Sequence, residues 1–227
     1  MSVSPEAQEK GTAMSEKNLK VAVVAANGRV GKLVVEEAAR RGMDVTAVVR
    51  GENKTAAEKS LVKDALELTA ADLAGFDAVV DAAGGWTPET IPAITNVAIH
   101  LADCVAGTPT RLVVVGGAGS LFVNPEHTAT VDQGPDFPED WKPLSAAHGA
   151  ALANLRERTD VVWTYVSPAA DFQADGERTG AYTLAGEELT LNAAGQSTVS
   201  YADYAIAIVD LLESGEHVRE RVSVVSK

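Results

Sequence analysis

The chain has 227 residues, enough for one α/β domain with at most a small appended lobe. Its hydrophobic content of 46% can form a sizeable core, while its formal net charge of −13 argues against nucleic acid or an anionic membrane surface as a partner, because both need a basic face. A single cysteine, Cys104, excludes an intrachain disulfide and a cysteine-based metal cluster, and no metal site is expected.

Residues 1–17 are polar and lack the apolar core of a signal peptide, so a disordered tail is expected there. No apolar run reaches the length of about 18 residues that a membrane span needs. The remaining residues, 18–227, are expected to fold as a single domain. We therefore expect a cytoplasmic protein without a membrane anchor.

The stretch over residues 20–38 begins with an apolar, β-branched run and continues with apolar residues at helical spacing. This order predicts a strand, a tight turn and a helix whose N-terminal N–H groups and dipole form an anion site. The usual occupant is the pyrophosphate of a dinucleotide. An ordinary βα turn without a nucleotide is the alternative. The residues of the turn that are expected to bind are Ala25, Asn27, Gly28, Arg29, Val30 and Gly31.

The glycine fingerprint of this turn is imperfect. Gly28 allows the backbone to approach a phosphate closely, and Gly31 allows the helix to pack against the strand. The first glycine of the pattern Gly-x-x-Gly-x-x-Gly is replaced by Ala25, a small intrusion that a slightly wider turn could accept. The surrounding strand–turn–helix order nevertheless supports a phosphate site.

A second buried strand is expected over residues 44–50, and it ends in Arg50. In a dinucleotide fold the end of this strand reaches the adenosine ribose, where an acidic residue selects NAD and arginine suits the 2′-phosphate of NADP. Arg29 and Arg50 therefore favour NADP, with NAD as the alternative, although Arg50 could also simply begin a solvated loop. Asp64 ends a short strand expected over 61–64 and could meet the adenine amino group or remain a surface carboxylate.

Small residues follow the fourth expected strand, which lies within residues 76–85. Ala82, Ala83 and Gly84 would let the cofactor lie flat across the sheet edge. A long helix is expected over residues 88–105. A further buried strand over 111–115 leads into a flexible glycine-rich loop that begins at Gly116, at the edge where α/β enzymes place their sites.

Residues 121–143 are irregular, proline-containing and acidic, and a loop of this length inside a domain is usually functional, such as a lid or a substrate wall. The other expected elements are a helix over 144–158, a strand over 161–166 followed by Pro168 at the cofactor, a hairpin of 180–184 and 188–191, a helix over 201–213 and a strand over 222–225. This alternation predicts an α/β fold with a doubly wound parallel sheet and helices on both faces.

Several of these segments resemble the NAD(P)H-binding atypical short-chain dehydrogenase/reductase family: residues 23–31, 80–84 and 115–121, together with Asp64. The segments 163–170, 176–180 and 200–205 are similar to bacterial proteins labelled "putative NADH-flavin reductases", a group related to biliverdin reductase B. The resemblance covers about residues 19–225. It implies a Rossmann sheet of about seven strands with a small C-terminal lobe on the substrate side, a nicotinamide cofactor and flavin as a hydride acceptor.

The sequence departs from the broader superfamily at its acid–base pair. Catalytic members carry Tyr-x-x-x-Lys on the helix after the fifth strand, and the matching segment 144–152 contains neither residue. Gly116 also stands where a serine is usual. Two tentative catalytic substitutes are Ser120, which could place a hydroxyl in the site, and His148, which is near the place of the lysine and titrates near neutral pH. Ser120 could instead cap the next segment, and His148 could be a half-exposed helix residue.

The missing acid restricts the chemistry. General acid catalysis accelerates a reaction by about 10²–10⁴-fold, so ketone reduction without the acid would be slow. A flavin or quinone is different, because it delocalises the negative charge that it receives with the hydride and takes its proton from water. The sequence therefore predicts an NAD(P)H-dependent reductase of a small flavin- or quinone-like acceptor, monomeric or homodimeric. The alternative is a non-catalytic NADP(H)-binding redox sensor. The hypothesis of an epimerase or dehydratase is weaker, because the reactions of those enzymes usually need the acid–base pair.

Overall fold

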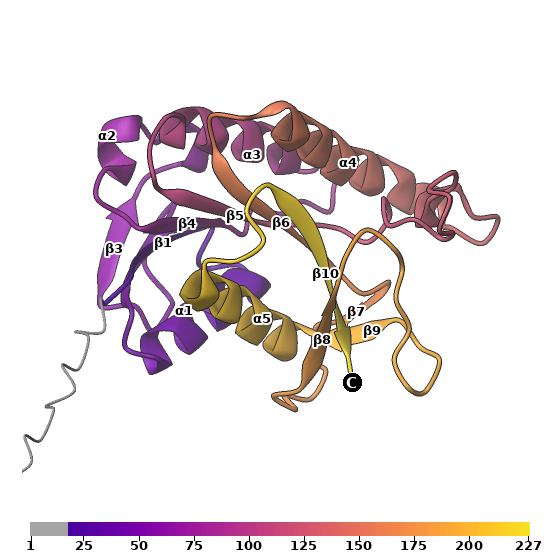
Figure 1. Ribbon diagram of the computed structural model, residues 1–227. Coiled ribbons are helices and arrows are strands. Elements are labelled where there is room, and N and C mark those ends of the chain that lie inside the picture. Colours follow the sequence, from indigo (N-terminus) through magenta and orange to yellow (C-terminus); the bar gives the residue numbers. More distant parts are fainter. Residues whose placement is uncertain (1–17) are drawn as a thin grey trace, which may run out of the picture.

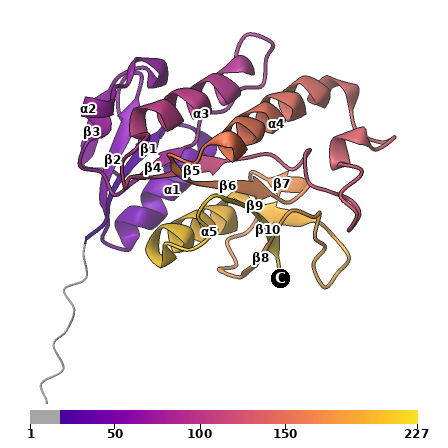
Figure 2. The same cartoon turned by 45° about the horizontal axis from the view of Figure 1, so that its top comes forward.

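The computed structural model describes residues 18–227, and the tail expected over residues 1–17 lies outside them. The described chain forms a central sheet that is covered by helices on both faces (Figure 1). Figure 2 shows the same layers from a direction in which the long helices on the upper face come forward. Within residues 18–227, no helix combines the length and the apolar character that crossing a membrane requires.

The strands of the large sheet are β1 (Lys20–Val24), β2 (Asp44–Val49), β3 (Lys59–Val62), β4 (Ala78–Asp81), β5 (Arg111–Val115), β6 (Val162–Pro168), β8 (Tyr182–Ala185) and β10 (Glu220–Ser226). A separate parallel pair consists of β7 (Asp171–Gln173) and β9 (Thr198–Ser200). The helices are α1 (Arg29–Arg40), α2 (Ala70–Leu73), α3 (Pro92–Val105), α4 (Lys142–Glu157) and α5 (Tyr201–Ser214). Short 3-10 turns occupy Ala65–Glu67, Val131–Gln133 and Glu139–Trp141.

The large sheet has eight strands in the order β3-β2-β1-β4-β5-β6-β10-β8. All neighbours are parallel except β8 and β10. The expected doubly wound, mainly parallel sheet is confirmed, with eight strands in place of about seven. The chain moves from β1 to one side through β2 and β3 and then to the other side through β4, β5 and β6. A crevice opens outside the carboxyl ends of the strands at such a switch point.

Alternating side chains of the strands build a core on each face of the sheet. Val21 and Val23 pack with α1 and α5, whereas Ala22 and Val24 pack with α3 and α4. Successive side chains of a strand point to opposite faces, so β1 is buried on both and reads as a continuous apolar run. These packed helices hold the loops at the carboxyl edge in place.

The hairpin predicted from residues 180–184 and 188–191 is wrong. β8 pairs with β10 instead, with Leu184 opposite Val224, and it forms the antiparallel edge of the large sheet. Residues 188–191 contain no strand: the backbone N–H of Leu189 donates to the carbonyl of Phe122. The alternating pattern of residues 188–191 does correspond to an extended segment, but this segment packs on a distant loop. Alternation alone does not specify with which segment a strand pairs.

The region around the third strand also differs from expectation. β3 ends at Val62, and Asp64 lies beyond the strand as the N-cap of a 3-10 turn, where its Oδ1 accepts from the N–H of Leu66 at 2.9 Å.

The pair formed by β7 and β9 was not anticipated. It makes the small C-terminal lobe, and Asp171 and Phe172 of β7 face the crevice.

Candidate functional site

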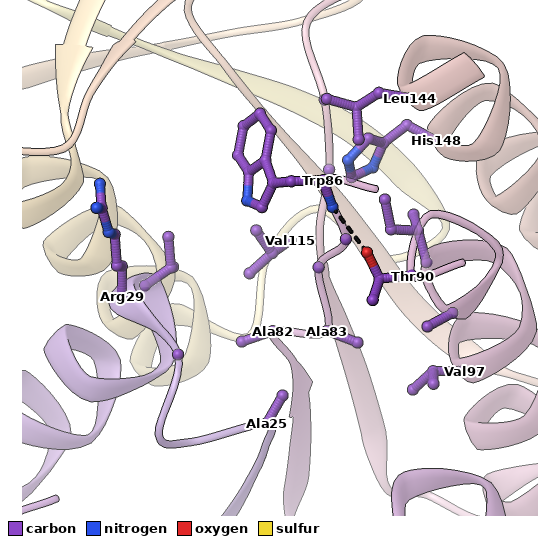
Figure 3. Close-up of a pocket in the computed structure, with 18 of the residues that line it drawn as sticks. Ala25, Arg29, Ala82, Ala83, Trp86, Thr90, Val97, Val115, Leu144 and His148 are labelled. Atoms are coloured by element: carbon purple, nitrogen blue, oxygen red, sulfur yellow. Dashed lines mark hydrogen bonds between the residues drawn. The ribbon is translucent and has the colours of Figure 1, made fainter. Parts of the chain in front are cut away.

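A cavity of about 1000 Å³ opens at the carboxyl edge of the sheet, at the switch between β1 and β4 (Figure 3). Its walls come from the turn after β1, from the segments that follow β2 to β6, and from the start of α5. Ligands of open α/β sheets bind at this position, so the cavity is the candidate site.

The turn between β1 and α1 is closed by a hydrogen bond from the N–H of Gly28 to the carbonyl of Ala25 at 2.9 Å. Ala25 has φ of +56°, in the region that favours glycine. Gly28 is the N-cap of α1 and offers no side-chain cap, and the first turn of α1 holds no acidic residue. The N–H groups at the start of α1 are therefore available to an anion, and the turn fits a dinucleotide pyrophosphate.

Asn27 connects this turn to the loop after β2. Its Nδ2 donates to the carbonyl of Glu52 at 2.9 Å, and its Oδ1 accepts from the N–H of Lys54 at 2.8 Å. Both polar atoms of the amide are thus engaged by one loop. Asn27 lines the cavity as predicted, and these bonds make it a positioning residue for the segment that carries Arg50.

The two arginines reach the cavity from different elements. Arg50 is exposed and begins the loop after β2. Arg29 projects from the first turn of α1 (Figure 3). Burial raises the pKa of the Tyr201 hydroxyl at the start of α5, and the guanidinium of Arg29 opposes this rise, which places Arg29 near α5. Asp64 also lines the cavity, with one carboxylate oxygen used as the cap described above.

Small side chains line the cavity at the end of β4. Ala82, Ala83 and Gly84 lie there as expected. Beneath them Asp81 is buried, and its Oδ1 accepts from the N–H of Ala83 at 2.9 Å. Burial raises the pKa of Asp81 to about 7, and the hydrogen bond from Ala83 only partly opposes this effect.

Trp86 is a cavity residue that the sequence reasoning missed. The preceding Gly85 has no room for a side chain, because a Cβ there would lie 2.2 Å from the carbonyl oxygen of Thr90. The N–H of Trp86 donates to Oγ1 of Thr90 at 3.0 Å, which fixes the backbone beneath the ring. The indole is 72% exposed and projects over the cavity between Arg29 and His148 (Figure 3).

Close packing, rather than flexibility, explains the glycines after β5. A Cβ at Gly116 would lie 2.3 Å from the ring of Tyr165, and one at Gly117 would lie 2.9 Å from the ring of His148. The loop therefore approaches β6 and α4 more closely than any side chain would permit. Gly116 and Pro168 both line the cavity, as predicted.

His148 lines the cavity from α4, close to a tyrosine of β6. The Tyr165 hydroxyl donates to the carbonyl of His148 at 3.1 Å and accepts from the N–H of Gly117 at 3.2 Å. Burial lowers the pKa of His148 to about 4 and raises the pKa of Tyr165 above its usual range. The expectation that His148 titrates near neutral pH is therefore wrong, because its ring is desolvated and no ion pair within residues 18–227 compensates.

Ser120 does not line the cavity. Its Oγ and its carbonyl oxygen accept from Nη1 of Arg221, at 3.1 and 2.8 Å. Arg221 is buried on β10, and its guanidinium also contacts Glu187. The structure thus places Ser120 in a polar cluster that joins the loops after β5 and β8 to β10, outside the cavity lining.

The long loop expected to form a lid or wall contributes Val131, Phe137 and Trp141 to the cavity. It is anchored to α4, where Oγ of Ser145 donates to Oδ2 of Asp132 at 2.6 Å. Like Trp86, the two aromatic residues of this loop were missed. Their signal was present: aromatic residues make up only 5% of the chain, and large aromatic side chains in polar loops at the carboxyl edge have little structural reason to be there.

Residues 18–227 contain no cluster of three or more His, Cys, Asp or Glu side chains that could hold a metal ion. The fold and the cavity together define a Rossmann-type dinucleotide-binding protein. A model of the family described as NAD(P)H-binding matches residues 25–215. The chain belongs to this family, whose class of cofactor is the nicotinamide dinucleotides.

Known proteins of similar sequence and structure support the assignment to this family. A Streptococcus pneumoniae protein described as "a putative NADH-flavin reductase" is 52% identical, with a TM-score of 0.90 over 92% of this chain and 100% of that one. A "putative epimerase" from Bacteroides thetaiotaomicron is 35% identical, with a TM-score of 0.81 over 92% of this chain and 98% of its own. The Bacillus subtilis (strain 168) protein YwnB is 39% identical over 211 residues, which are 92% of this chain and 99% of YwnB. The family resemblance predicted from the motifs is confirmed.

Proposed function

We propose that this oxidoreductase-like member of the NAD(P)H-binding family transfers a hydride from NADPH to a flat flavin- or quinone-like acceptor. The observation that carries the proposal is the aromatic lining of the cavity, where Trp86, Phe137 and Trp141 stand together with Phe172 and Tyr201. Aromatic faces bind planar rings and exclude water from them. The similarity to a Streptococcus pneumoniae protein described as a "putative NADH-flavin reductase" supports the same acceptor class.

The cavity lining favours an acceptor that needs no strong acid. His148 is neutral at pH 7, because its pKa is about 4 as a result of burial. The hydroxyl of Tyr165 already bonds to Gly117 and to the backbone of His148. Lys142, at the start of α4, pairs with Glu139 and does not line the cavity. Reaction with an electron-poor ring fits these residues better than reduction of a ketone.

Each part of the cavity has a proposed role in holding the cofactor. The turn from Ala25 to Gly31 binds the pyrophosphate, and Arg50 contacts the 2′-phosphate, so NADP is preferred to NAD. Ala82–Gly84, Gly116 and Pro168 leave space for the nicotinamide ring. When bound, NADPH supplies a hydride with both electrons, and with one proton from water the oxidised acceptor becomes its dihydro form while NADP⁺ remains.

Steady-state oxidation of NADPH with riboflavin, FMN and several quinones tests the proposal. Turnover with at least one of them is expected, and Trp86→Ala should raise the KM of the acceptor several-fold while the Kd of NADPH stays constant. Leu191→Ala is the matched control, since it also truncates an exposed apolar side chain, 56% exposed, but outside the cavity lining. Tight stoichiometric binding of NADPH without turnover of any acceptor would refute the reductase and favour the redox sensor.

A further inference from the structure

The charges that line the cavity are unevenly distributed. Toward the adenosine end, the segments after β2 and β3 contribute Arg50, Lys63 and Asp64. The other end, here called the acceptor half, consists of the lining residues from Gly85 onward along the chain. Its charged members are Glu89 and Asp171, and no lysine or arginine belongs to it. Arg29 belongs to the turn that fits the pyrophosphate and lies near Tyr201, so it stands between the two ends.

The two carboxylates of the acceptor half are held by local contacts. A hydrogen bond from the Thr87 side chain lowers the pKa of Glu89, so this exposed residue is ionised at neutral pH. The Asp171 carboxylate accepts from Nε2 of Gln173 at 2.7 Å on the exposed edge of β7. Within residues 18–227, neither carboxylate forms a salt bridge.

The loop that carries Phe137 and Trp141 adds to this negative field. Residues 131–142 contain four acidic side chains and a single basic one, Lys142, which pairs with Glu139. A phosphate in the acceptor half would carry about two negative charges at pH 7, and the lining residues from Gly85 onward include no lysine or arginine to receive it.

We infer that the acceptor half selects flat, uncharged ring compounds and discriminates against phosphorylated ones, so that riboflavin is reduced in preference to FMN. This inference rests on the proposed reductase function. Single exposed charges repel weakly in water, but two carboxylates acting together on a dianion amount to about tenfold in kcat/KM at low ionic strength. Salt near 1 M reduces the Debye length to about 3 Å and should largely remove the preference.

Riboflavin and FMN carry the same ring and differ in one phosphate, so they isolate the charge effect. With saturating NADPH at low ionic strength, we expect kcat/KM for riboflavin to exceed that for FMN by about tenfold, and the ratio to approach one near 1 M salt. The double variant Glu89→Gln/Asp171→Asn should raise kcat/KM for FMN several-fold and leave riboflavin nearly unchanged.

The matched control is Glu36→Gln/Glu157→Gln, which removes two charges from exposed positions outside the cavity lining. A control that changes the ratio as much as the cavity variant would overturn the inference, because net charge would then explain it. Equal kcat/KM for the two flavins in the unmodified protein would also overturn it and leave the reductase intact. Absence of turnover with either flavin and with all quinones would refute the reductase itself, and the inference with it.

Discussion

Gly31 lies against the carbonyl of Ala25: a Cβ atom at position 31 would stand 2.7 Å from that oxygen and 2.9 Å from Cα of Ala26. Backbone atoms cannot move aside as a flexible side chain can. The contact therefore sets how closely α1 approaches β1, and with it the position of the N–H groups that face the proposed pyrophosphate.

Gly31→Ala should accordingly push α1 away from β1. We expect the free energy of unfolding to fall by about 1–3 kcal/mol, as for other overpacked positions, and the Kd of NADPH to rise about tenfold or more. Urea unfolding and fluorescence titration measure the two effects. Gly149→Ala is the control, because a Cβ at this α4 position would meet no atom within 4 Å. Equal behaviour of the two variants would show that the close contact has no consequence.

Arg50→Asp should shift the protein from NADPH toward NADH. The substitution removes the proposed partner of the 2′-phosphate and introduces a carboxylate that can bind the free 2′-hydroxyl of NADH. We expect the Kd of NADPH to rise about tenfold or more and that of NADH to fall. Lys54→Asp makes the same change of charge in the same exposed loop, outside the cavity lining, and should leave the preference in place. Unchanged dissociation constants in Arg50→Asp would contradict the assignment.

Asp81→Asn should stabilise the protein at alkaline pH. Burial raises the pKa of Asp81 from its ordinary value of 3.8 to about 7, so between these pH values the folded state holds a proton that the unfolded state has released. The free energy of unfolding therefore falls as pH rises through this window. Asparagine removes the penalty and keeps an oxygen for the N–H of Ala83, so we expect a gain of up to roughly 4 kcal/mol at pH 8.

Urea denaturation of both proteins at pH 8 and near pH 4 checks this expectation, since the gain should shrink toward zero at the lower pH. A variant that is less stable than the unmodified protein at pH 8 would show that Asp81 has an ionic partner when the protein is folded.

His148 gives the opposite pH dependence. Burial lowers its pKa from 6.5 to about 4, so between these values the unfolded state binds a proton that the folded state does not. The free energy of unfolding should fall as pH drops through this window, and His148→Gln should weaken that dependence. Lost packing lowers the free energy of unfolding equally at every pH. Urea titrations repeated at several pH values give the slope of this free energy against pH, and the slope separates the two effects. Identical slopes in both proteins would show that His148 is solvated.

Local patterns were sufficient for much of the fold. The apolar run of β1, the break at Gly28 and the helical spacing of α1 are all contained within a short stretch of chain, so their geometry follows from local preferences. The same logic failed for residues 188–191, because alternation specifies an extended chain and not its neighbour. It also failed for Ser120, whose hydroxyl is bound by Arg221 from the far end of the chain.

The sequence by itself determined the alternation of strands and helices from β1 to β6, the strand–turn–helix at the start of the sheet and the family, since each depends on residues that are close in the chain. Only the tertiary structure decided the chemistry of the cavity. Asp81 and His148 owe their pKa values to desolvation by segments distant in sequence. Trp86 and Trp141, 55 positions apart, line one cavity because α3 and α4 pack on the same face of the sheet. Burial and convergence depend on the whole fold, and no local pattern encodes them.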